Sequence, residues 1–443
     1  MAAEHRAAEY RAAEHRVFGP PYRTVLRPYG RALVALARQR PEIVCLSGDL
    51  TRQCEIDLFQ AEFPDRFIHA GMAEANMIGV AGALARSGLI PFVHTFGVFA
   101  TRRPLDQIVN AVAYPRLPVR IVGFMPGVSS PGGPSHQAIE DVALMRALPG
   151  MTVVDVADAT ETAQVVAAIA DVPGPVYLRL KRGEIPVIFP ADHRLSLDRA
   201  QVLSDTGTSG GAQTSGGADT KGGGVTSGGA VTTGGADSDG GGVSSGGGVT
   251  LGGADSDGGG VTSGGGVIAG GGVSSGGAVT TGGGVTTGGG VTRVSAAPSS
   301  DVALLASGMM IAPALAAARA LRTAGISTVV VNVPVIKPLD TATILAVAAR
   351  SHSVITAENH TIIGGLGSAV AEALAATTLP VPLTRVGLND TFAEGAQSAP
   401  HLFTTYGLTT QHLIDAAWQS LHRPGNPPLA PPLPADEGEY APV

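Results

Sequence analysis

Residues 74–136 contain three kinds of side chain whose types and spacing could do chemistry. Glu74 is the single carboxylate in an almost wholly apolar stretch that ends at Ala85. Phe96 and Phe99 follow it, three positions apart, and His136 ends a loop rich in glycine and proline. A buried carboxylate needs a specific partner, an aromatic pair offers a flat stacking surface, and a histidine titrates near neutral pH.

Each group also has an ordinary structural explanation. A glutamate in a first helical turn often complements the helix dipole, phenylalanines usually pack in a core, and a lone loop histidine is usually solvated. The order and spacing of the three groups together favour a functional site.

The elements that must position these groups alternate between strand-like and helix-like patterns. His69–Ala85 reads as a short lead-in and a helix whose apolar surface belongs inside a protein or an interface. Apolar strands are expected on both sides of it, and a polar turn with Asp49 follows the first strand. Regular alternation predicts an α/β fold with a doubly wound, mostly parallel sheet, whose ligands bind beyond the carboxyl ends of its strands.

Composition limits the other functional classes. The chain has 443 residues, a net charge of −7 and no basic stripe, so nucleic acid is not expected as a partner. Its two cysteines, Cys45 and Cys54, give no disulfide framework or metal spacing and fit a reducing cytoplasm. We expect neither a membrane span nor a signal peptide, because no apolar run has the required length or flanks.

Six short motifs give the chain a family resemblance. They are Leu46-Ser-Gly-Asp-Leu50, Gly71-Met-Ala-Glu-Ala-Asn-Met77, Thr95-Phe-Gly-Val-Phe99, Gly133-Pro-Ser-His-Gln137, Leu180-Lys-Arg-Gly183 and Ile363-Gly-Gly-Leu-Gly-Ser368. With them the chain resembles the C-terminal half of transketolase-type thiamine diphosphate enzymes, and most closely the split members whose halves are separate polypeptides. The resemblance covers about Arg23 to Pro190 and about Asp301 to Leu421.

The resemblance and the composition together predict five segments. Of the 62 glycines most lie in one low-complexity block, where such dense glycine cannot repay its ordering entropy. The segments are a flexible N-terminal extension (1–22), a pyrimidine-binding domain (23–195), a disordered Gly-rich linker (196–298), a smaller mixed-sheet C-terminal domain (299–422) and a disordered Pro-rich tail (423–443).

The resemblance also implies roles for individual residues. In such enzymes a protonated acid in a dry pocket hydrogen-bonds the pyrimidine N1′ of thiamine diphosphate, and Glu74 matches that catalytic glutamate. Phe96 and Phe99 match the aromatic residues that hold the pyrimidine, and Asp49 would lie close to the thiazolium. His136 matches a histidine that exchanges protons with the substrate, and Arg182 matches an arginine that binds a sugar phosphate.

A missing motif implies a partner subunit. These enzymes hold the diphosphate through Mg²⁺, with a Gly-Asp-Gly motif and a later asparagine, and this chain has no Gly-Asp-Gly. The resemblance therefore implies a second polypeptide with the diphosphate-binding domain, an active site at the interface, and an α2β2 assembly.

Three positions depart from the family pattern for substrate recognition. Gly132 stands where ordinary transketolases have an aspartate that contacts a sugar hydroxyl, Phe124 replaces a second histidine, and Gln53 replaces a phosphate-binding serine. Donor or acceptor recognition is therefore expected to differ from that of an enzyme for pentose phosphates.

The sequence predicts one subunit of a heteromeric transketolase-like enzyme that moves a two-carbon ketol unit from a ketose to an aldose. Three alternatives remain open: the β subunit of a 2-oxoacid dehydrogenase E1 component, a deoxyxylulose-phosphate-synthase-like enzyme, and a non-catalytic assembly partner. The His136 loop and Arg182 favour a sugar substrate over a 2-oxoacid.

Overall fold

The computed structural model describes residues 22–204, 299–396 and 398–430, together with four short strands between the first two ranges. Residues 1–209 and 298–443 belong to one compact unit, and residues 210–297 form another. The predicted N-terminal extension, most of the predicted linker and the last part of the predicted tail lie outside the described residues.

The second unit contains two antiparallel strand pairs. They are β10 (Val261–Ser263) with β11 (Val267–Ala269), and β12 (Val285–Thr287) with β13 (Gly290–Thr292).

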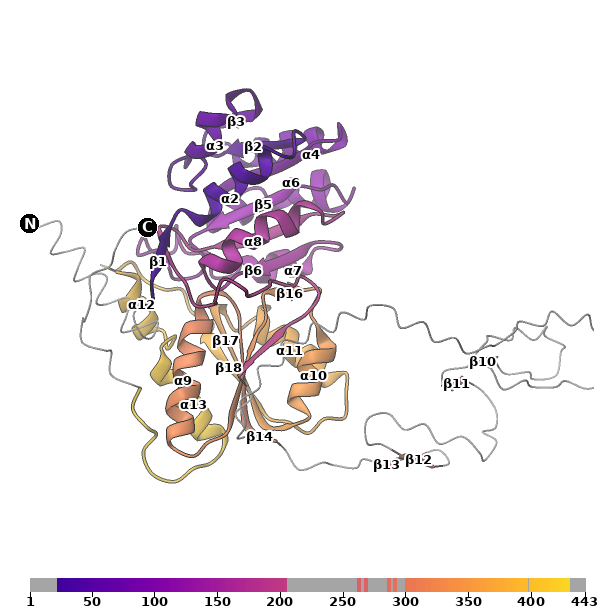
Figure 1. The fold of residues 1–443 in the computed structure, drawn as a ribbon, viewed down its shortest axis with the longest axis vertical. Coiled ribbons are helices and arrows are strands. Elements are labelled where there is room, and N and C mark those ends of the chain that lie inside the picture. Colours follow the sequence, from indigo (N-terminus) through magenta and orange to yellow (C-terminus); the bar gives the residue numbers. More distant parts are fainter. Residues whose placement is uncertain are drawn as a thin grey trace, which may run out of the picture. The chain divides into compact units, whose positions relative to one another are not determined.

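The first sheet has seven strands in the order β16-β6-β7-β5-β4-β2-β3, all parallel except β16 (Figure 1). Its parallel strands are β2 (Ile43–Ser47), β3 (Phe67–His69), β4 (Ile90–Phe96), β5 (Arg120–Phe124), β6 (Thr152–Asp155) and β7 (Val176–Leu180). The central strands β2, β5 and β7 are mostly apolar and are buried along their whole length.

Helices cover both faces of this sheet. One apolar core contains side chains of α2 (Pro28–Ala37) and α8 (Ala159–Ala170), and the other contains side chains of α4 (Glu74–Arg86), the π-helix η2 (Ile108–Ala113) and α7 (Asp141–Ala147). The shorter helices are α3 (Asp57–Glu62), η1 (Pro64–Arg66), α5 (Gly97–Thr101) and α6 (Leu105–Gln107). The predicted doubly wound, mostly parallel sheet is confirmed.

The second sheet is smaller and mixed, which is also as predicted. Its order is β18-β17-β14-β15-β9, and only β9 runs antiparallel. The strands are β9 (Gln201–Ser204), β14 (Ser300–Ala306), β15 (Thr328–Asn332), β17 (Ser351–Thr361) and β18 (Leu383–Leu388). One core contains residues of α9 (Ile311–Thr323), α12 (Ala399–Thr405) and α13 (Thr410–Ser420), and the other those of α10 (Thr341–Ala348) and α11 (Leu366–Ala375). The short helix η3 (Gly308–Met310) precedes α9.

Two short strands connect parts of the chain that the sequence patterns did not join. Strand β16 (Val335–Lys337), which follows β15 in the chain, pairs with β6 of the first sheet. Strand β9 lies within the segment predicted as linker and extends the second sheet. A further pair, β1 (Thr24–Leu26) with β8 (Glu184–Pro186), stands outside both sheets.

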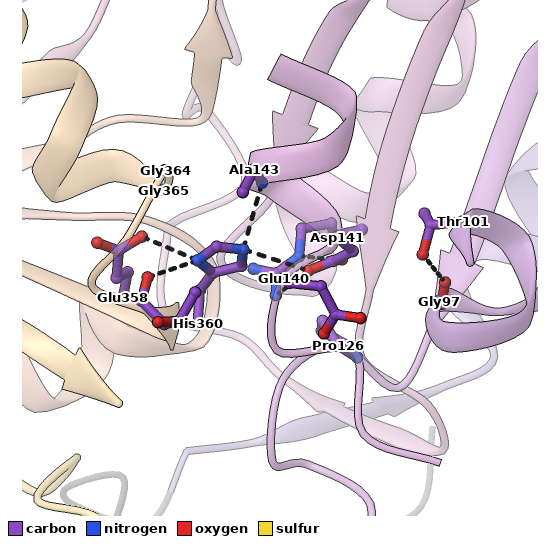
Figure 2. A network of polar contacts seen from close by, with 12 residues as sticks. Gly97, Thr101, Pro126, Glu140, Asp141, Ala143, Glu358, His360, Gly364 and Gly365 are labelled. Carbon is purple, nitrogen blue, oxygen red and sulfur yellow. Dashed lines mark hydrogen bonds and ion pairs between the residues drawn. The ribbon is translucent and has the colours of Figure 1, made fainter. Parts of the chain in front are cut away.

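A buried ion network lies where the two sheets meet. Arg179 on β7 donates to both carboxylate oxygens of Asp141, to Asp155 and to the carbonyl of Asn359, and Asp155 also accepts from Ser307. His360 on β17 lies between Glu358 and Asp141, as Figure 2 shows, with its ring nitrogens 3.7 and 3.9 Å from their carboxylates.

No helix among the described residues is both long and apolar enough to cross a membrane. Nor does the described part of the chain group three or more histidine, cysteine or acidic side chains in a way that could hold a metal ion.

Candidate active site

Glu74 is the first residue of α4, a helix that must pack tightly because its buried face is made of small and apolar residues. At Gly82 an added Cβ would lie 2.5 Å from the carbonyl oxygen of Ala111, so only glycine allows this close approach to η2. At the start of the helix the Glu74 side chain is only 4% exposed.

The partner of Glu74 is Arg103, a residue that the sequence analysis did not single out. The guanidinium Nη1 of Arg103 donates to Oε1 of Glu74 at 2.7 Å. The central carbon of this guanidinium lies over the Phe99 ring, 4.2 Å from the ring centroid. Arg103 thus joins the acid to the aromatic pair while its own side chain stays 51% exposed.

The two phenyl rings lie at the end of β4. The strand ends at Phe96 and the chain turns directly into α5, so Phe99 lies in a helical turn rather than in a continued strand. This turn stacks the two rings, with centroids 6.2 Å apart and planes 18° apart. A Cβ on Gly97 would lie 3.2 Å from Ala138 and from the Tyr177 hydroxyl, so the turn itself is tightly enclosed.

His136 completes the cluster. Its ring lies edge-on to Phe99 and Phe96, with centroids at 5.3 and 6.5 Å. Its Nδ1 is 2.9 Å from the Ser135 hydroxyl. A Cβ on Gly132 would be 3.0 Å from Cβ and Cγ of His136, so the glycine found at this position leaves the space that the imidazole uses.

The His136 loop is held from both of its sides. Arg102 pairs with Glu140 and donates to the carbonyls of Pro134 and Gln137 at 2.8 and 2.9 Å. The buried Gln137 amide donates to the carbonyls of Ser130 and Glu394, and the Ala396 amide donates to the Pro131 carbonyl at 3.0 Å. The segment that follows β18 therefore helps to fix the histidine.

Asp49 and Arg182 lie at the same edge of the first sheet but outside this cluster. Asp49 follows β2 with a φ of +108°, is about half exposed, and has its carboxylate 4.0 Å from Nε2 of His69. Arg182 is exposed two residues beyond β7, and its positive charge opposes the burial that raises the pKa of Cys54. Neither residue has a hydrogen bond or ion pair to Glu74 or His136 among the contacts that the structure describes.

The surroundings of Phe124 explain why an apolar residue is found at this position. Its ring is fully buried and lies edge-on to Tyr29, with centroids 5.6 Å apart. Phe124 is thus a core residue, so a side chain there contributes packing rather than a polar contact to substrate.

These residues fit one half of thiamine diphosphate. A desolvated carboxylate beside stacked aromatic rings suits an aminopyrimidine, which needs a hydrogen-bonding acid and a flat surface.

Comparison with known proteins gives a consistent family. Residues 23–187 match the transketolase pyrimidine binding domain, and residues 290–413 match the transketolase C-terminal domain. The chain is 35% identical to an uncharacterized transketolase family protein, y4mN, of Sinorhizobium fredii, with 87% of this chain and 86% of that protein covered. It is 32% identical to the 6-deoxy-6-sulfo-D-fructose transketolase subunit SqwH of a Clostridium species, with 89% and 94% covered.

A solved structure adds to this. The chain is 32% identical to a split gene transketolase described as an inactive beta4 tetramer, with a TM-score of 0.62 and with 89% of this chain and 97% of that chain covered. The domain matches, the relatives and this structure agree with the predicted resemblance, and the chain belongs to the transketolase family as a C-terminal-half, transketolase-like subunit.

Proposed function

We propose that this chain is the C-terminal subunit of a heteromeric, thiamine-diphosphate-dependent transketolase that transfers a two-carbon ketol unit from a ketose to an aldose. The observation that carries the proposal is the cluster at one edge of the first sheet, in which Arg103 links Glu74 to Phe99, and Phe99 lies against Phe96 and His136. A carboxylic acid, a stacking surface and an imidazole are the groups that this chemistry asks of the pyrimidine side of the site.

The bound cofactor would supply a nucleophilic carbon that attacks the ketose carbonyl. Glu74 would hold a proton at the pyrimidine nitrogen, in a pocket dry enough to keep that hydrogen bond strong. Phe96 and Phe99 would orient the pyrimidine by stacking. His136, kept in place by its loop, would donate and remove a proton at the substrate oxygen. In this proposal Asp49 faces the thiazolium and Arg182 binds the anionic end of the sugar.

The same proposal includes a partner. The absence of Gly-Asp-Gly from the sequence supports a separate diphosphate-binding subunit that holds Mg²⁺. We propose that the two subunits form an α2β2 assembly in the cytoplasm. The split gene transketolase to which the chain is similar was found as an inactive tetramer of its β chain, which fits a need for a second chain.

For the substrate, we infer a ketose with an anionic group at its far end. The similarity to a 6-deoxy-6-sulfo-D-fructose transketolase subunit supports an anion that need not be a phosphate. The glycine at position 132, beside the imidazole, supports recognition that differs at the hydroxyl next to the reacting carbon.

The test is reconstitution. The full chain is mixed with a candidate partner of the diphosphate-binding type, and ketol transfer is measured with and without thiamine diphosphate and Mg²⁺ for a panel of phosphorylated and sulfonated ketoses. We expect cofactor-dependent turnover and a loss of about 10²–10⁴-fold for Glu74→Ala, as for other deletions of a general acid or base. A Glu74→Ala complex with activity within a few-fold of wild type contradicts the role of Glu74.

A further inference from the structure

We propose that Arg103 is a built-in occupant of the pyrimidine site: in the free chain its guanidinium takes the place of the cofactor's aminopyrimidine and must leave before the cofactor binds. The inference rests on the proposed function, because it assumes that Glu74 and Phe99 form the pyrimidine site.

The geometry gives Arg103 both contacts that a pyrimidine would need. One N–H donates to the Glu74 carboxylate at 2.7 Å, and the guanidinium carbon lies 4.2 Å above the Phe99 ring. A guanidinium is planar, carries N–H donors in its plane and stacks on aromatic faces. An aminopyrimidine is also planar and would hydrogen-bond the same carboxyl group, although its ring nitrogen accepts where the guanidinium donates. The two groups therefore compete for one carboxyl group and one ring.

The neighbouring arginine shows that this placement is not a general property of the turn after α5. Arg102 is tied to the Glu140 carboxylate and to two backbone carbonyls of the His136 loop. Arg103 is instead 51% exposed and has a path to solvent. Its two contacts are of the kind that contribute little at exposed sites, so the side chain can be displaced.

The ion pair also opposes the proposed chemistry while it lasts. The Arg103 guanidinium occupies the Glu74 carboxyl group, which the proposed role directs toward the pyrimidine nitrogen. Displacement of Arg103 would therefore both open the ring face of Phe99 and release Glu74 for its role.

The experiment measures binding rather than turnover. Thiamine, which has the aminopyrimidine but no diphosphate, is titrated against the full chain alone, and the dissociation constant is obtained by equilibrium dialysis. We expect Arg103→Ala to bind thiamine about fivefold to tenfold more tightly than wild type, because a competing intramolecular contact is removed. Arg103→Lys, which keeps the charge but loses the planar group, should lie between them. Arg86→Ala, an exposed arginine at the other end of α4, is the matched control and should bind like wild type.

Equal or weaker thiamine binding by Arg103→Ala, including no detectable binding at millimolar concentrations, overturns the inference. The double variant Glu74→Ala/Arg103→Ala separates the two proposals. If it binds thiamine as tightly as Arg103→Ala does, the ligand lies elsewhere, and the assignment of the pyrimidine site fails together with the proposed function. If the double variant binds thiamine no more tightly than wild type, Glu74 belongs to the thiamine site and Arg103 occupies that site in the free chain.

Discussion

Two clusters of charged side chains among the described residues differ in how completely their charges are paired. In the Arg179 network every named charge is buried and bonded: the guanidinium donates to two carboxylates and a carbonyl, and the side chains of Arg179 and Asp141 are 1% and 0% exposed. In the Glu74 cluster a single buried acid has a half-exposed arginine as its partner, beside two aromatic rings and a histidine.

This difference shows why burial of a charge is not by itself a sign of a site. A fully satisfied network leaves no group for a ligand and serves to fix two sheets against each other. An acid whose partner can move to water keeps its carboxylate available for an exchange of partners. Variants that remove one charged residue from each cluster therefore test whether the two clusters differ in how firmly their charges are paired.

The largest effect on stability is expected from Arg179→Met. It leaves Asp141 and Asp155 buried without their cation, which should lower the free energy of unfolding by about 3–5 kcal/mol. Glu74→Ala is the matched change in the other cluster and should cost no more than about 1 kcal/mol, since Arg103 can turn to solvent. Urea denaturation of both variants measures the loss of unfolding free energy in each. Equal losses would show that the two clusters do not differ.

The pH dependence of stability should come from the buried network, through Glu358. Burial raises the pKa of Glu358 to about 7, against hydrogen bonds from the amides of Gly367 and Leu366 that lower it. The unfolded chain then loses this proton at a lower pH than the folded chain does, so the contribution of Glu358 to stability falls as the pH rises from about 5 to 7.

His360 acts in the opposite direction and must be separated from this effect. Burial lowers its pKa to about 4, so the neutral ring contributes stability that is lost as the pH falls below about 6. Comparison with Glu358→Gln isolates the carboxyl: between pH 5 and 8 wild type should lose about 2–4 kcal/mol more than the variant. Parallel stability curves for the two proteins would show that Glu358 does not titrate in this range.

The smallest effect is expected from Gly132→Ala. The new Cβ would lie 3.0 Å from His136, so the imidazole must shift by a few tenths of an ångström while the fold is unaffected. We expect the reconstituted enzyme to lose about threefold to tenfold in kcat, with an unchanged melting temperature, because small misplacements of a proton-transfer group are costly. An unchanged kcat would mean that the position of the ring is not critical.

The fold was largely predictable, because each main element carries its own pattern. The apolar strands expected on both sides of the Glu74 helix are present as β2 and β4, and the helix itself begins at Glu74. Strands β9 and β16 were missed because a three- or four-residue edge strand has no periodicity of its own and pairs with residues far away in the chain. The sequence did not show that Phe96 ends a strand while Phe99 lies in a helix, because the chain turns at Gly97.

The candidate site was predictable only in part. Motif spacing pointed to Glu74, Phe96, Phe99 and His136. In the structure the three rings lie against one another, and Arg103 links Glu74 to Phe99. Arg103 could not be found in this way, since two adjacent arginines look alike in a sequence and only the turn after α5 sends one toward Glu74 and the other toward Glu140. Arg179 of the buried network could not be predicted either, because its partner Asp141 is 38 residues away in the sequence.

The most direct test of the central claim is proton exchange at C2 of the thiazolium of thiamine diphosphate bound to the reconstituted complex. It reports on the activated cofactor without knowledge of the sugar. Exchange into deuterium oxide is followed by quenched-flow mixing and NMR for the wild-type and Glu74→Gln complexes. If Glu74 is the activating acid, the variant should exchange at least about 100-fold more slowly at equal cofactor occupancy. Exchange within threefold of wild type would contradict the account.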